Sequence, residues 1–229
     1  MQLKSNLAQE KAPARWTLYI DGALGAEGTG AGLLLISPEK VTLEYGLRFR
    51  FPATNNVAEY EALIAGLRLA TDCKVESLTI YVDSQIVVSQ VEGEYEAKND
   101  QLAQYLALAK SLLAKIPSHQ VIHIPREQNT QADSLSKLAT SSASYQSRRR
   151  RVEDIMTPSS QGPWEVSMID GKQTSWMTPI REYLEHRQLP DDRVEARRLQ
   201  IRAATFAIID GELYKRAFSG PYLKCLPAS

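Results

Sequence analysis

Few cysteines, no long apolar run and no net charge set the first limits on this chain. Its 229 residues include two cysteines, Cys73 and Cys225, far apart and in no metal-ligand spacing. This scarcity indicates neither a disulfide framework nor a zinc site, and it fits a reducing compartment. No apolar stretch approaches the roughly 20 residues that cross a bilayer, and the opening MQLKSNLAQEK lacks the apolar core of a signal peptide. We therefore expect an intracellular, soluble protein without membrane contact, in cytoplasm or nucleus.

The balance of 27 basic and 27 acidic residues hides an uneven distribution of charge. From Arg15 to Ala143 there are eleven Lys and Arg against fifteen Asp and Glu, whereas from Ser144 onward there are fourteen against eleven. A net negative front part excludes nucleic-acid binding through a general basic surface. Any binding there would need metal ions and local contacts.

Hydrophobic periodicity predicts an α/β fold in the front part. Strand-forming residues at 16–20, 28–36 and 41–51, with tight connections, indicate an antiparallel meander. The expected helices then cover 57–67, 85–91, 101–115 and 129–140, and the expected strands cover 78–82 and 120–124. Strands that alternate with helices pair in parallel through right-handed crossovers. We predict a mixed five-stranded sheet, three strands antiparallel and two parallel, flanked by helices.

A change of composition near residue 144 predicts a second, smaller unit. We expect an N-terminal extension at 1–14, the main domain at 15–143, a linker at 144–160 and a small helical and hairpin tail at 161–229. The segment SSASYQSRRRR is poor in apolar residues and is typical of a linker. In the tail we expect helices over 176–189 and 191–204, and a hairpin around Asp210-Gly211, which favours a type I′ turn.

Four carboxylates stand in local settings that together suggest a metal site. Asp21 and Asp83 each end a strand-like run and precede a small residue, whereas Glu59 and Asp133 fall near the starts of expected helices. Strand ends and helix starts at one edge of an α/β sheet converge where ligands bind. Clustered carboxylates repel one another unless divalent cations lie among them.

Each acid alone also has a structural explanation, which the sequence leaves open. A single Asp after a strand commonly caps a turn or the next helix. Glu59 suits the helix dipole, and Asp133 could pair with Lys137 one turn later. Glu59 is the better ligand than Glu61, because Glu61 shares a helix face with Arg68 that we expect to lie toward solvent.

The motifs around these acids resemble type 1 ribonuclease H. The segments YIDGA, GAG, TNNVAEYEALIAGL, YVDSQ and IPREQNTQADSLSKLA follow in that family's order, with similar spacing, from about Trp16 to Ala143. More narrowly, they resemble the ribonuclease H region of plant gypsy-type LTR retrotransposon polyproteins. In those, a tail resembling WMTPIREYLEHRQLP and IIDGELYKRAFSGPYLKCL leads toward the integrase. The resemblance implies a ribonuclease H-like fold followed by a segment that precedes an integrase.

By this resemblance, Asp21, Glu59, Asp83 and Asp133 are expected to be catalytic and to bind two Mg²⁺ ions, with Mn²⁺ as a substitute. The family hydrolyses the RNA strand of RNA–DNA hybrids and leaves 5′-phosphate and 3′-hydroxyl ends. In two-metal hydrolysis, ions about 3.5–4 Å apart activate the attacking water and stabilise the leaving oxygen. The resemblance implies that Asp21 bridges the ions and that Asp133 serves the nucleophile side.

The resemblance also implies contacts with the hybrid. The residues that match RNA-strand contacts are Gly22, Asn55, Asn56 and Gln85, and those that match a DNA-phosphate pocket are Thr54 and Asn99. The 2′-hydroxyl is the group that distinguishes RNA from DNA. For Thr54, Asn55 and Asn99, a helix start or cap is the alternative explanation.

Two features depart from the family pattern. Many members carry a His shortly before the last Asp that is thought to help product release. His123 stands at a compatible distance, but inside the apolar strand pattern VIHIP, which favours a structural role. The short, acidic VEGEYEAKND replaces the Trp-rich basic protrusion of some members. We therefore expect weak hybrid binding by the isolated chain, with the polymerase part of a polyprotein supplying affinity.

The sequence thus predicts an endonuclease that cuts RNA–DNA hybrids, from a polyprotein whose reverse transcriptase and integrase parts are its partners. The alternative is a catalytically silent module of a decayed element, which binds hybrid or only connects its neighbours. The presence of all four acids favours the enzyme. An integrase core on the same fold would need its acids in a different motif order.

Overall fold

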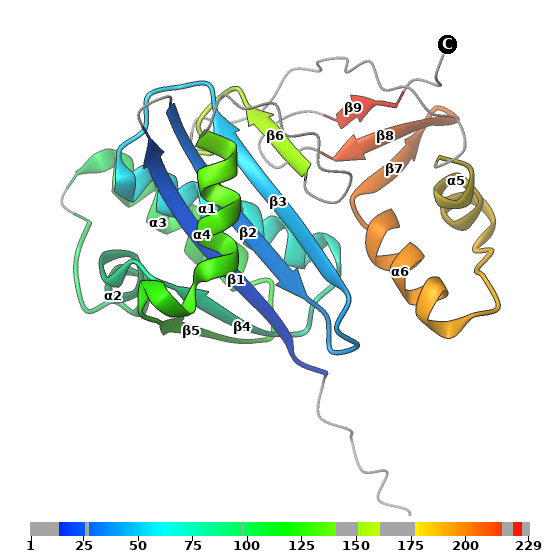
Figure 1. Cartoon of the computed structure of the whole chain (residues 1–229), viewed down its shortest axis with the longest axis horizontal. Helices are drawn as coiled ribbons and strands as arrows, with labels where there is room; N and C mark the ends of the chain where they lie inside the picture. Colours follow the sequence, from blue (N-terminus) through cyan, green and yellow to red (C-terminus); the bar gives the residue numbers. More distant parts are fainter. Residues whose placement is uncertain are drawn as a thin grey trace, which may run out of the picture.

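A mixed sheet flanked by helices forms the centre of the computed structural model (Figure 1). The structure describes residues 14–25, 28–97, 99–140, 151–160, 177–216 and 222–225, so the expected extension at 1–14 lies almost wholly outside them. The sheet order is β5-β4-β1-β2-β3-β6. Its strands are β1 (Trp16–Gly25), β2 (Gly28–Ile36), β3 (Thr42–Phe49), β4 (Ser77–Val82), β5 (Ser118–His123) and β6 (Arg151–Ile155).

The strand pairing confirms the five predicted strands and adds a sixth. Strands β1, β2 and β3 form the antiparallel meander, and β4 and β5 continue the sheet in parallel beside β1. Strand β6 pairs in parallel with β3 and lies in the segment expected to be a linker. Its sequence, RVEDI, shows little apolar alternation, so the strand depends on its partner more than on its own propensity. By pairing with β3, it covers what would otherwise be an open sheet edge.

The helices cover both faces of this sheet. They are α1 (Asn55–Asp72), α2 (Gln85–Glu92), α3 (Asp100–Leu113) and α4 (Thr130–Thr140), with a 3-10 turn, η1, at Arg126–Gln128. In Figure 1, α4 crosses the front of the sheet, and α1 and α3 lie behind it. Among the described residues, no helix combines the length and apolar character needed to cross a membrane.

Glycines in β2 and β3 allow α4 to lie directly on the sheet. Gly32 pairs with Asp21 of β1 on one side and with Gly46 of β3 on the other. A Cβ at Gly32 would stand 2.0 Å from the carbonyl oxygen of Ala132 in α4, a distance that no side chain can adopt. A Cβ at Gly46 would stand 3.1 Å from the carbonyl oxygen of Leu135. Gly32 of the GTGAG motif and Gly46 of β3 therefore provide the seat for α4.

The tail folds into a second, smaller unit with its own core. Its elements are α5 (Met177–His186), α6 (Arg193–Ala203), β7 (Phe206–Ile209), β8 (Glu212–Arg216) and β9 (Tyr222–Lys224). The core of this unit comprises Met177, Ile180, Leu199, Ala203, Phe206 and Leu213. The hairpin prediction is confirmed: Asp210 and Gly211, between β7 and β8, have φ values of 50° and 75°, as a type I′ turn requires.

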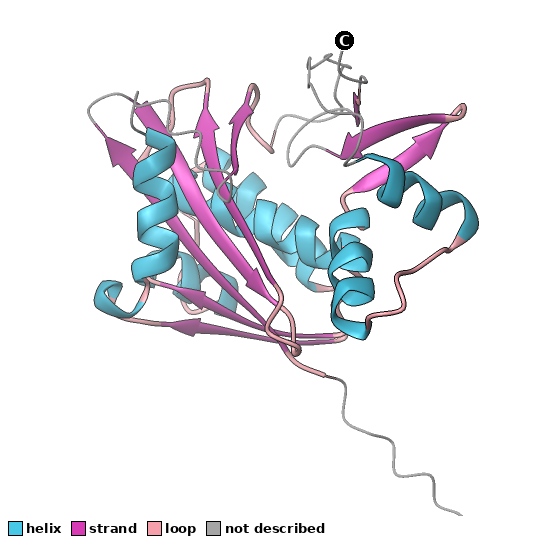
Figure 2. Cartoon of the chain, turned by 45° about the vertical axis from the view of Figure 1, so that its right-hand side comes forward, coloured by secondary structure: helices cyan, strands magenta, loops and turns pink. Residues whose placement is uncertain are grey.

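The second unit packs against the main domain (Figure 2). Ile201 of α6 is buried in the main hydrophobic core, although its neighbours on the helix face the small core. Arg216 forms an ion pair with Asp72 at the end of α1, and Lys215 forms one with Glu153 of β6. The tail is therefore attached by apolar burial and by charge pairs, and not by the chain connection alone.

The expectation that Glu61 faces solvent is wrong. Its side chain is 2% exposed and accepts hydrogen bonds from the Tyr105 hydroxyl at 2.6 Å and the Ser159 backbone N–H at 2.7 Å. Burial raises the pKa of the Glu61 carboxyl. The error has a physical cause: the turn after β6 covers this face of α1, and helical periodicity cannot reveal a covering segment 98 residues away.

Candidate metal centre

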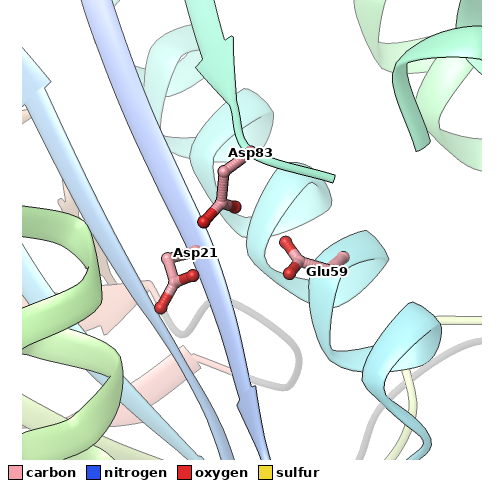
Figure 3. Close-up of side chains that lie close together, drawn as sticks. All are labelled: Asp21, Glu59 and Asp83. Carbon is pink, nitrogen blue, oxygen red and sulfur yellow. The ribbon is translucent and has the colours of Figure 1, made fainter. Parts of the chain in front are cut away.

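Three of the four predicted acids converge beside β1, close to the end of β4 (Figure 3). Asp21, Glu59 and Asp83 each offer a carboxylate oxygen, and these oxygens all lie within 4.8 Å of one another. Asp21 and Glu59 are buried, with 1% and 4% exposure, whereas Asp83 is half-buried. Such a group of oxygen donors suits a hard divalent cation.

The sheet register brings the two aspartates together. Ile20 of β1 pairs in parallel with Val82, the last residue of β4. Asp21 is the next residue of β1, and Asp83 is the residue directly after β4, so the two aspartates lie side by side. The predicted proximity is therefore correct, but the expectation that Asp21 ends a strand is wrong, because β1 continues through pairing with β2 as far as Gly25.

A close approach between β1 and α1 places Glu59 beside them. A Cβ at Gly22 would stand 2.5 Å from the backbone nitrogen of Glu59, so only glycine lets the helix come this near. The glycine in YIDG thus permits the close approach that places Glu59 beside the two aspartates.

The electrostatics of the centre favour a bound cation. Burial, followed by the nearby charges of Asp83 and Asp21, raises the pKa of Glu59 to about 9. Burial and the charge of Asp83 also raise the pKa of Asp21 to about 7, against the lowering effect of a hydrogen bond from Ser136. The buried atoms Glu59 Oε2 and Asp83 Oδ1 have no hydrogen-bond partner among the described residues. Unpaired buried acceptors are costly, and a divalent cation would satisfy both.

Asp133 lies near this group but is held by two basic side chains. Its carboxylate pairs with Arg126 at 3.0 Å and with Lys137 at 2.6 Å. Although partial burial acts to raise it, hydrogen bonds from Lys137 and Arg126 hold the pKa of Asp133 below its ordinary value. The Lys137 pair, left open as an alternative from the sequence, is present in the structure. Asp133 is not one of the three acids with oxygens within 4.8 Å.

Two buried polar side chains connect the α4 region to β1 and were not singled out as functional from the sequence. The Asn129 side-chain N–H donates to the Ile20 carbonyl at 2.7 Å, and the Ser136 hydroxyl donates to Asp21 Oδ2. No local pattern could have indicated the Ser136 contact, because it depends on the glycine seat under α4.

The residues matched to hybrid contacts lie mostly at helix starts. Thr54 caps α1 by accepting the Val57 N–H at 3.3 Å, and Asn99 caps α3 by accepting the Leu102 N–H at 2.8 Å. Asn55 and Asn56 begin α1, and Gln85 begins α2. The Gln85 amide donates to the Ser89 hydroxyl at 3.1 Å. The capping roles named as alternatives for Thr54 and Asn99 are therefore present.

His123 occupies the end of β5 and not the interior of a strand. Its side chain is exposed, and its backbone pairs with Val82, the residue before Asp83. The imidazole therefore belongs to the same edge of the sheet as the acids.

Comparison with known proteins supplies a family. Residues 21–139, about half of the chain, match the family model described as reverse transcriptase-like. The chain belongs to this family. A ribonuclease HI from Halobacterium salinarum is 35% identical over 127 residues, a match that covers 55% of this chain and 64% of the relative. The match therefore spans slightly under two thirds of the length of this relative.

Two further matches agree with this membership. The crystal structure of RNase H1 from the same archaeon has a TM-score of 0.51 at 33% identity, covering 55% of this chain and 96% of that chain. This likeness confirms the predicted ribonuclease H fold. The putative hydrolase EbsB from Enterococcus faecalis is 30% identical over 129 residues, covering 53% of this chain and 91% of the relative.

Proposed function

We propose that this protein hydrolyses the RNA strand of RNA–DNA hybrids with the help of divalent metal ions. The observation that carries the proposal is the convergence of Asp21 in β1, Glu59 in α1 and Asp83 after β4. Glu59 and Asp83 each have one buried oxygen without a hydrogen-bond partner among the described residues. The ribonuclease HI relative and the shared fold support the same reaction class.

In this proposal, Asp21, Glu59 and Asp83 hold Mg²⁺, or Mn²⁺ in its place. Bound ions of this kind activate a water for attack on phosphorus and stabilise the leaving oxygen. The chain's own contribution is to fix the carboxylates through the β1–β4 register and the Gly22–Glu59 approach. We include Asp133 as the fourth acid, serving a second ion. To do so, its carboxylate has to exchange one of its two ion pairs for that ion.

The hybrid would lie across the edge of the sheet where the acids emerge. The starts of α1 and α2, with Asn55, Asn56 and Gln85, flank this edge and suit contacts with the RNA strand. Gly22 has no side chain, so it would contact the RNA strand through its backbone. Thr54 and Asn99 are exposed helix caps, and we assign them a contact to a DNA-strand phosphate, since exposed helix starts favour anions. We assign His123 to product release because of its exposed place at this edge.

We further propose that the chain derives from a retrotransposon polyprotein and works beside reverse transcriptase and integrase parts. The motif resemblance supports this origin, and so does the second unit, whose helices and hairpin lie in the segment that resembles the pre-integrase region. In that arrangement the polymerase part would supply much of the hybrid affinity, because the segment between α2 and α3 is short and acidic.

A cleavage assay with three duplexes of one sequence tests the reaction. We expect the full chain to cut the labelled RNA strand of an RNA–DNA hybrid in Mg²⁺ or Mn²⁺, and to leave the all-DNA duplex intact. The products should carry 5′-phosphate and 3′-hydroxyl ends, so a ligase should rejoin them. An all-RNA duplex shows whether the DNA strand is required. Hybrid binding without cleavage in either metal would instead support the silent module.

A further inference from the structure

We propose that Ser136 is a positioning residue that fixes the Asp21 carboxylate for metal binding. This inference rests on the proposed function. The Ser136 side chain is completely buried, and its hydroxyl donates a hydrogen bond to Asp21 Oδ2. Asp21 and Ser136 are 115 residues apart in the sequence, so the contact exists only because α4 crosses β1.

A serine hydroxyl in a helix ordinarily donates its hydrogen bond to a backbone carbonyl of the preceding turn, and Ser134 of the same helix does so. Ser134 is exposed, and its hydroxyl donates to the Thr130 carbonyl at 2.7 Å. Ser136 also lies 2.9 Å from its own helix carbonyl, that of Asp133. A hydroxyl carries one hydrogen, and a bond to a carboxylate is stronger than one to a neutral carbonyl. The ionised Asp21 therefore takes the Ser136 hydrogen.

The packing of α4 makes this contact rigid. Asp21 pairs with Gly32, and a Cβ at Gly32 would stand 2.6 Å from the Ser136 backbone nitrogen. The absence of a side chain there is what brings the serine within reach of the acid. Asn129, just before α4, holds the preceding carbonyl, that of Ile20. Two buried side chains of this region thus hold consecutive residues of β1.

The consequence for chemistry is an oriented ligand. A hydrogen bond to Oδ2 restricts rotation of the carboxylate and stabilises its ionised form, which is the form that binds a cation. Removing a hydrogen-bond partner of a metal ligand typically weakens metal binding about 10–100-fold. Without Ser136, Asp21 would have to be ordered by the metal itself.

Calorimetric titration of Mn²⁺ into the full chain, without substrate, tests the inference. We expect Ser136→Ala to bind Mn²⁺ at least about tenfold more weakly than the unaltered chain. The matched control, Ser134→Ala, removes the same hydroxyl from the same helix and should bind as the unaltered chain does. Equal affinity in the two variants would overturn the role of Ser136 and leave the proposed function standing. Failure of the unaltered chain to bind Mn²⁺ or Mg²⁺ would overturn both.

A double-mutant cycle distinguishes an effect of Ser136 on Asp21 from a general loss of stability. The melting temperatures of the unaltered chain, Ser136→Ala, Asp21→Ala and the double variant are measured in EDTA. If Ser136 acts through Asp21, its removal should change the melting temperature much less in the Asp21→Ala background than alone. Equal changes in both backgrounds would show that the serine only fills space under α4.

Discussion

Replacing Glu59 with glutamine should stabilise the metal-free protein and weaken its metal binding. Glu59 is 4% exposed, lies among two other acids, and has one oxygen without a partner in the described part of the chain. An amide cannot ionise, so the variant avoids the cost of a buried charge. Stability gained by removing an ionisable functional group from a buried site is the expected trade-off.

The size of this effect follows from the pKa of Glu59, which lies at about 9 in the folded chain against an ordinary value of 4.5. Between these values the folded state keeps a proton that the unfolded state releases. The unaltered chain therefore loses stability as pH rises, by up to about 1.4 kcal/mol per pH unit. From pH 5 to pH 8 the loss is on the order of 2–4 kcal/mol, once structural relaxation lowers the cost of the buried charge.

Thermal denaturation in EDTA at pH 5 and pH 8 measures the difference. For a domain of this size, about 1 kcal/mol corresponds to roughly 2–4 °C. We expect Glu59→Gln to melt several degrees above the unaltered chain at pH 8, with the gap narrowing toward pH 5. Added Mg²⁺ should raise the melting temperature of the unaltered chain more than that of the variant. A gap that is absent at pH 8, or equally large at pH 5, would refute the reasoning.

Three further perturbations test other parts of the structure. Gly32→Ala should lower the free energy of unfolding, measured in urea, by more than about 3 kcal/mol, because the new methyl group would overlap the backbone of α4. Gly46→Ala should lower it less, and equal losses in the two variants would contradict the role of these glycines under α4. Deleting residues 144–229 should lower the melting temperature, because Glu61 loses its hydrogen bond from Ser159, and should promote self-association, because β3 becomes an open sheet edge. A monomer in size-exclusion chromatography with an unchanged melting temperature would show that the tail is dispensable. His123→Ala should slow multiple-turnover cleavage but not the first turnover, and equal slowing of both would exclude a role in product release.

Residues with strong local signals were predicted well from the sequence. Asp21 and Asp83 follow apolar runs that are strands, and the crossover rule places those strands side by side. The hairpin at Asp210-Gly211 has an equally local cause, since both residues must adopt positive φ. In these cases the determining interactions lie within a few residues, or follow from a general rule of chain topology.

What the sequence could not predict depends on segments that meet only in the folded chain. Strand β6 carries little pattern of its own and was expected to be a linker. Glu61 has a solvent-side helical position until the turn containing Ser159 covers it. Ser136 gains its contact with Asp21 from a glycine on another strand. Local periodicity carries no information about such long-range contacts.

The central claim is that the three converging acids drive cleavage, and the rate with Asp83→Asn tests it most directly. The single-turnover rate of RNA-strand cleavage is measured in Mg²⁺ for the unaltered chain, for Asp83→Asn, and for Asp154→Asn as a matched change at an exposed acid of β6. We predict that Asp83→Asn falls at least about a thousandfold, about 4 kcal/mol of barrier, while it folds normally and Asp154→Asn stays near the unaltered rate. An Asp83→Asn rate within tenfold of the unaltered chain would contradict the account.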